Sequence, residues 1–101
     1  MLETFALATF SPLVGTEFRV DVGGALPVAL RLAEASSLSG GKGIPAGRTR
    51  EPFALVFRGP ARPTLSQRTY PFEHAALGRF DVFIVPIGPD ADGPRYEAIF
   101  T

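Results

Sequence analysis

The sequence predicts an all-β domain, either a small six-stranded antiparallel barrel or a two-sheet sandwich, with one short helical turn near its N-terminus. Three observations support this class. Apolar and polar residues alternate with a period of two, most clearly at 16–22; short apolar runs recur along the chain; and glycine or proline separates them. A single open sheet would leave one apolar face in water, so we expect the strands to enclose one shared core.

The composition fits one globular domain. The chain has 101 residues, of which 46% are hydrophobic and 20% charged, a size that supports one core but not two. It contains no cysteine, which excludes disulfides, thiolate catalysis and thiolate metal sites. We therefore expect a single domain over residues 1–101, with a flexible glycine-rich loop at about 38–52.

Charge and hydropathy exclude several partner classes. Ten basic residues balance ten acidic ones, so no global field attracts nucleic acid. Six arginines fall between Arg48 and Arg79, either as a local basic patch or as a solvated face, and short charge patterns favour the second interpretation. No apolar run approaches the ~20 residues that span a bilayer, and the Met-Leu-Glu start lacks the cationic region of a signal peptide. We expect a soluble, unprocessed protein.

The first half of the chain predicts a helical turn and a hairpin. Residues 11–15, Ser-Pro-Leu-Val-Gly, have a capping serine, a proline suited to the first helical position and a glycine suited to the exit. The alternation at 16–22 indicates a half-buried strand, Gly23-Gly24 a tight turn, and residues 28–33 the returning strand. This hairpin is the best-defined local unit in the sequence.

The second half predicts four more strand-like segments. They lie at 53–58, 70–74, 78–88 and 95–100, with a proline- and aspartate-rich turn at 89–94. Within 70–74, Pro71 indicates an edge strand, because its missing N–H group would point at solvent.

The strand at 78–88 has two unlike faces. Phe80, Val82 and Ile84 share one face, which we expect to point into the core. The other face begins polar and continues with Phe83 and Val85, so we expect this strand to start near solvent and to end covered on both sides.

His74 is the only histidine and therefore the first candidate for a general base. No spacing indicates a partner nucleophile or an orienting carboxylate, and the neighbouring Glu73 points to the opposite face of the strand. A structural role, with a ring nitrogen holding a nearby turn, is favoured over catalysis.

Other motifs are incomplete. Residues 90–93, Asp-Ala-Asp-Gly, resemble the start of a calcium loop, but the twelfth position is Thr101 and cannot close it. Residues 39–43 lack the glycine spacing of a phosphate-binding loop. We predict no catalytic, cofactor-binding or metal-binding residue and no cofactor. Arg58, Tyr70 and His74 remain as candidate ligand or interaction residues, and a structural ion pair is the favoured role for Arg58.

Several short segments of the sequence carry a family resemblance. They lie at 10–15, 52–60, 70–74 with Leu77-Gly78, 83–90 and 96–100. Together they resemble a family of uncharacterised bacterial domains of about this length. The resemblance implies association with phage-tail-collar-like fibre proteins and carries no catalytic residue. The loop from Leu38 to Glu51 is longer here than the usual connection of that family.

The leading functional hypothesis is a non-enzymatic interaction or assembly module. An exposed strand edge, a proline-bounded loop or a small apolar patch would contact a protein partner or a second copy, in the cytoplasm or within a tail-like particle. The alternative is a small-ligand-binding β-barrel with Arg58, Tyr70 and His74 around its mouth. A third hypothesis is hydrolysis centred on His74. No small-molecule substrate is identified.

Overall fold

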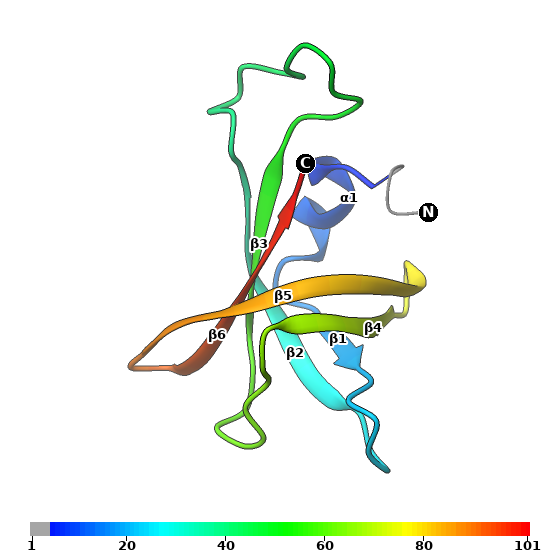
Figure 1. The fold of residues 1–101 in the computed structure, drawn as a ribbon, viewed down its shortest axis with the longest axis vertical. Helices are drawn as coiled ribbons and strands as arrows, with labels where there is room; N and C mark the ends of the chain where they lie inside the picture. The colour runs from blue at the N-terminus through cyan, green and yellow to red at the C-terminus, as the bar shows by residue number, and fades with distance from the viewer. Residues whose placement is uncertain (1–4) are drawn as a thin grey trace.

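A computed structural model describes residues 5–101, whose six antiparallel strands close into a barrel (Figure 1). The elements in chain order are α1 (Leu7–Phe10), the 3₁₀ helix η2 (Ser11–Leu13), β1 (Glu17–Val20), β2 (Val28–Ser37), β3 (Phe53–Arg58), β4 (Arg68–His74), β5 (Gly78–Asp90) and β6 (Gly93–Phe100). The strand order is β1-β2-β3-β6-β5-β4, and β4 returns to β1. The prediction of an all-β domain is confirmed. Of the two architectures predicted, barrel and sandwich, the structure has the barrel.

The closing seam is short. β1 and β4 pair at only two positions, Arg19 opposite Glu73 and Val20 opposite Phe72. The main chain adds a bond in which the N–H of Asp21 donates to the carbonyl of Pro71 over 2.9 Å. β4 is therefore paired on both sides, and the expectation that Pro71 marks an edge strand is wrong. The proline is tolerated because its carbonyl, the one polar group it keeps, faces the seam and is bonded there.

The barrel interior is filled by aromatic and aliphatic side chains. Every phenylalanine except Phe83 is buried. The rings meet in edge-on and stacked pairs, among them Phe18 with Phe57 at 5.3 Å between centroids and Phe53 with Phe100 at 4.7 Å. Such contacts are typical of a close-packed core rather than of a binding cavity.

The N-terminal helical segment packs against this core. It begins earlier than predicted, because α1 precedes the 3₁₀ turn and Ser11 continues the helix, its hydroxyl donating to the carbonyl of Leu7. Phe10 is fully buried, and its ring lies 5.8 Å from that of Phe53 and 5.7 Å from that of Phe100. One buried side chain thus anchors the helix to β3 and β6.

The β5–β6 hairpin projects beyond the rest of the barrel (Figure 1). Pairing of β5 with β4 ends at Ile84 opposite Arg68, whereas pairing with β6 continues to Asp90 opposite Gly93. The predicted turn at 89–94 is therefore shorter, and both of its prolines lie within strands. Pro89 fits in β5 because this part of the strand has no β4 residue beside it, so its missing N–H group breaks no ladder bond on that side. Pro94 fits in β6 because it lies just beyond Arg95, where the pairing of β6 with β3 ends.

The connection between β2 and β3, residues 38–52, also projects from the barrel, at the end where β6 finishes (Figure 1). Its position agrees with the sequence prediction of a glycine-rich loop. At its base the N–H of Leu38 donates to the carbonyl of Pro52 over 2.9 Å.

Candidate interaction surface

His74 ends β4 with its imidazole buried and both ring nitrogens bonded. The N–H of Ala76 donates to Nδ1 over 2.9 Å, and Nε2 lies 2.8 Å from Oγ1 of Thr16. The Thr16 hydroxyl donates to the carbonyl of Leu13 over 2.7 Å, so its oxygen accepts the hydrogen bond that Nε2–H donates. Burial lowers the pKa of His74 below its ordinary value of 6.5. The neutral ring therefore holds the β4–β5 turn to the segment before β1, and no ring nitrogen is left for a substrate.

Arg58 ends β3 and forms a two-pronged ion pair with Asp90 at the end of β5. Nη1 donates to Oδ1 over 2.7 Å and Nη2 to Oδ2 over 2.6 Å. These bonds hold the pKa of Asp90 well below its usual range, and the N–H of Asp92 adds a third donor. Asp90, the first residue of the calcium-like sequence, is thus occupied by a guanidinium that fixes the projecting hairpin.

Tyr70 points into the barrel from β4 and is almost fully buried. Its hydroxyl donates to the carbonyl of Ser66 over 3.0 Å. The guanidinium of Arg68 lies over its ring, 4.6 Å from the centroid. The three residues named from the sequence therefore hold three different structural contacts.

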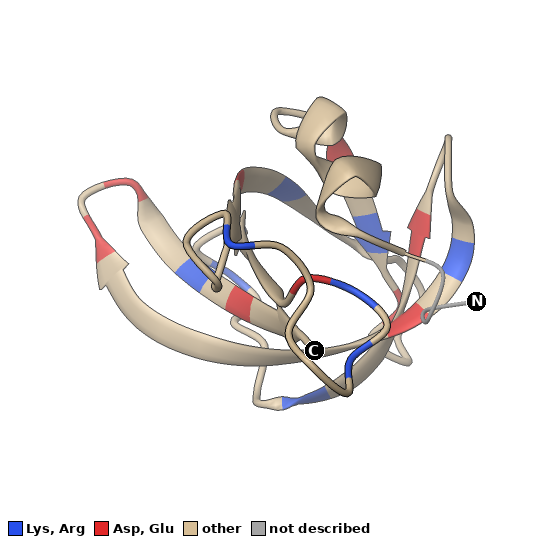
Figure 2. Cartoon of the chain, turned by 90° about the horizontal axis from the view of Figure 1, so that it is seen from above, with Lys and Arg blue, Asp and Glu red and all other residues tan. Residues whose placement is uncertain are grey.

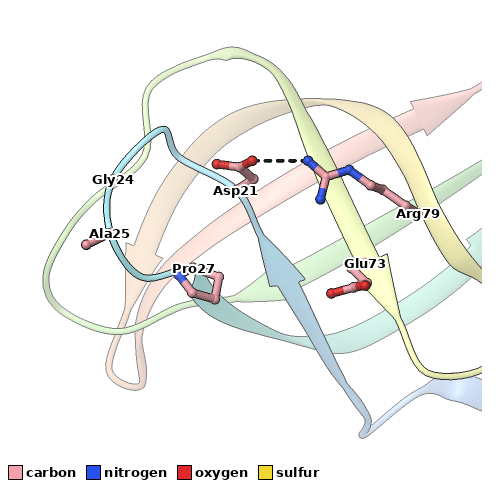
Figure 3. A pocket seen from close by; sticks show the side chains of 6 residues that line it. All are labelled: Asp21, Gly24, Ala25, Pro27, Glu73 and Arg79. Atoms are coloured by element: carbon pink, nitrogen blue, oxygen red, sulfur yellow. Dashed lines mark hydrogen bonds and ion pairs between the residues drawn. The ribbon is translucent and has the colours of Figure 1, made fainter.

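Four hollows on the described part of the chain measure about 250, 240, 240 and 170 Å³. All four are smaller than the ~300–1,000 Å³ typical of small-molecule sites. The first lies beside the closing seam, where Asp21 and Arg79 form an ion pair at 3.1 Å (Figure 3). Glu73, which also lines it, pairs with Arg19 at 3.2 Å. The charges of this hollow are therefore neutralised within the chain.

The second hollow differs from the first because exposed apolar side chains line it. Phe83 on β5 and Ile99 on β6 are 51% and 50% exposed, and both border this space of about 240 Å³. Val85, two residues beyond Phe83 on the same face of β5, is half-buried. We call Phe83, Val85 and Ile99 the outer patch. The expectation that β5 ends covered on both faces is wrong for Phe83.

The reason for this error is the barrel itself. The alternation of β5 places Phe80, Val82 and Ile84 inside, with exposures of 6%, 3% and 0%, and therefore places Phe83 outside. A barrel closes one sheet on itself and has no second layer over its outer face. The sequence signal that could have identified the patch is a large apolar side chain, Phe83, at a position of the strand that alternates with the inward-facing Phe80, Val82 and Ile84.

The fold and the surface define a class: a small closed β-barrel with a solid aromatic core and an apolar patch on its wall. Within that class the chain belongs to the family described as a domain of unknown function (DUF6916), whose model matches residues 5–100. No curated protein and no solved structure matches the chain. Among the described residues, no helix is long and apolar enough to cross a bilayer.

Proposed function

We propose that this domain is a non-enzymatic interaction and assembly module, and that it is an accessory or structural component of a bacterial phage-tail-like fibre system. The observation that carries the first part is the outer patch, in which Phe83 and Ile99 stand half-exposed on a wall whose interior is already filled. The tail-like assignment rests on the family resemblance of the sequence.

The physical argument is that the outer patch leaves apolar surface exposed to water. A half-exposed phenylalanine beside a half-exposed isoleucine contributes little to the core, and burial against a partner would be favourable at roughly 25 cal/mol for each Å² covered. Large exposed apolar side chains that lie together are more informative than isolated ones. The patch is therefore available for contact with another protein.

The alternative routes find less support. Barrel closure leaves few of the strand edges on which β-augmentation depends. Part of β5 beyond Ile84 lies outside the β4 pairing, but Pro86 there has no N–H group to donate. A small-ligand barrel would need space inside, where the aromatic rings instead pack against one another.

The test combines size measurement with capture. The purified chain is examined by light scattering over a wide concentration range and is then mixed with the purified products of neighbouring genes. We expect self-association or capture of one of these proteins. In the double variant Phe83→Ser/Ile99→Ser we expect that association to be lost. A strictly monomeric chain that captures none of them would contradict the proposal.

The matched control is Leu26→Ser, which removes another apolar side chain, 79% exposed, from the loop between β1 and β2. It should associate like the parent chain. If the captured protein is unrelated to tail fibres, the tail-like assignment is wrong while the interaction role stands.

A further inference from the structure

The segment 38–50, which forms most of the 38–52 connection between β2 and β3, has an unusual charge composition. It contains Lys42, Arg48 and Arg50 and no acidic residue, and Figure 2 shows the basic segments along it. Leu38 and Ile44 in the same loop are 50% and 59% exposed. In a chain whose total charge balances, this is a local concentration of positive charge and apolar surface on one projecting segment.

The nearest acidic residue along the chain belongs to the loop base. The carboxylate of Glu51 accepts hydrogen bonds from the hydroxyls of Ser37, over 2.9 Å, and Ser39. These bonds lower the pKa of Glu51. Its oxygens therefore organise the start of the loop rather than pair with the cations farther along it.

The three cations have different roles. Nη1 of Arg50 donates to the carbonyl of Phe5 over 2.8 Å, and its guanidinium lies 5.4 Å from the centre of the Phe100 ring. Arg50 thus fastens the end of the loop to the barrel. The side chains of Lys42 and Arg48 are exposed, and within residues 5–101 neither forms an ion pair.

The loop and the outer patch meet at one place. Arg50 lines the same hollow of about 240 Å³ as Phe83 and Ile99. Apolar contact on the barrel wall is therefore continuous with the base of a cationic loop. A partner that covers the patch therefore lies against the base of that loop, and an extended segment of such a partner can continue along it.

Resting on the proposed function, we infer that the partner contacts this surface through a protein segment that combines apolar side chains with carboxylates. The apolar side chains cover Phe83 and Ile99, and the carboxylates pair with Lys42 and Arg48. Arg50 orients the loop. The complementary charges guide encounter and select the partner, while the patch provides most of the buried area.

The same face disfavours other anionic partners. Asp81 lines the hollow beside Phe83, and Glu97 lies opposite Val85 on the same wall. A nucleic-acid backbone or an anionic bilayer would bring negative charge against both carboxylates. A peptide can place its acidic residues at the loop alone and present apolar side chains elsewhere.

The test uses defined probes and the full chain. A fluorescent peptide of alternating glutamate and leucine is titrated with the protein, alongside a lysine–leucine peptide of equal length. We expect the acidic peptide to bind at least tenfold more tightly and to weaken about tenfold as salt rises from about 0.05 M to about 0.5 M. Equal binding of the two peptides, or tighter binding of the lysine peptide, overturns the inference.

Matched variants locate the site. Lys42→Ala/Arg48→Ala should weaken binding of the acidic peptide by about tenfold. Arg31→Ala/Arg62→Ala, which removes two exposed cations outside the loop, should leave it unchanged. Equal losses in the two variants overturn the loop assignment. Anionic phosphatidylserine vesicles and a single-stranded oligonucleotide are the competing probes, and tighter binding of either one also overturns it.

The experiment separates this inference from the proposed function. If Phe83→Ser/Ile99→Ser abolishes capture of a neighbouring gene product while Lys42→Ala/Arg48→Ala does not affect it, the interaction module stands and the acidic-segment inference fails. If neither variant affects that capture, the outer patch itself is excluded as the interaction surface.

Discussion

Thr16 and His74, 58 residues apart in sequence, are joined by a hydrogen bond of 2.8 Å between Oγ1 and Nε2. The bond connects the segment after η2 to the end of β4, close to the seam that closes the barrel. Because Nδ1 is occupied by the N–H of Ala76 at 2.9 Å, only one neutral tautomer satisfies both contacts. The single histidine of the chain thus stabilises the fold in one protonation state.

That relationship predicts a pH-dependent stability. Burial lowers the pKa of folded His74 below 6.5, so at pH values between the folded pKa and about 6.5 the unfolded chain binds more protons. Stability should be highest above about pH 6.5, fall as the pH drops through that window, and show no further loss from this group below the folded pKa. Urea unfolding at a series of pH values measures it. His74→Asn should lack this component, and an identical pH profile in the variant would contradict the assignment.

The pair between Arg58 and Asp90 predicts a second effect. Asp90→Asn should lower the urea midpoint at neutral pH, because Arg58 loses its charged partner. The pKa of Asp90 is lowered from 3.8, so the pair stabilises the fold above about pH 3.8 and its contribution is lost as the pH falls further. Asp92→Asn is the control, because among residues 5–101 the Asp92 carboxylate forms no ion pair and only attracts Arg58 from a distance. Equal midpoints for the two variants at neutral pH would argue against a stabilising pair.

Even a methyl side chain at position 59, in place of Gly59, should destabilise the fold. A Cβ atom at Gly59 would lie 2.8 Å from Cδ2 of Leu30 and 3.1 Å from Cε2 of Tyr96, both in the core. Gly59→Ala should therefore lower the free energy of unfolding by about 1–3 kcal/mol. At Gly24 a Cβ meets nothing within 4 Å, and Gly24→Ala should be neutral or stabilise by up to about 1 kcal/mol. Chemical denaturation compares the two, and equal effects would refute the steric argument.

Replacing Phe10 and replacing Phe83 with alanine should have very different effects on the free energy of unfolding. Phe10→Ala removes a fully buried ring that anchors the helix to the barrel, and should cost about 3–5 kcal/mol of unfolding free energy. Phe83→Ala removes a ring that is 51% exposed, and should change stability by about 0.5 kcal/mol or less. Thermal unfolding measures both. A large loss in Phe83→Ala would mean that the outer patch serves folding rather than partner contact.

The sequence was most informative about elements. Alternation located β1, and a continuous apolar run ended by Gly59-Pro60 located β3. Glycine and proline located the loop at 38–52, because their effects on the backbone act within a few residues. It also identified the inward face of β5, where Phe80, Val82 and Ile84 are buried. The sequence was less informative about the candidate site. Arg58, Tyr70 and His74, which it grouped around one barrel mouth, share no site and have different hydrogen-bond partners.

By itself, the sequence of this protein determined its class and its periodic core: an all-β chain whose aromatic positions fill one interior. Only the tertiary structure decided that β4 pairs with β1, that Asp90 forms an ion pair with Arg58, and that Phe83 is exposed to solvent beside Ile99. The physical reason is the distance along the chain over which each kind of interaction acts. Strand periodicity and turn chemistry depend on near neighbours, whereas closure, ion pairing and exposure depend on which distant segments the sheet brings side by side.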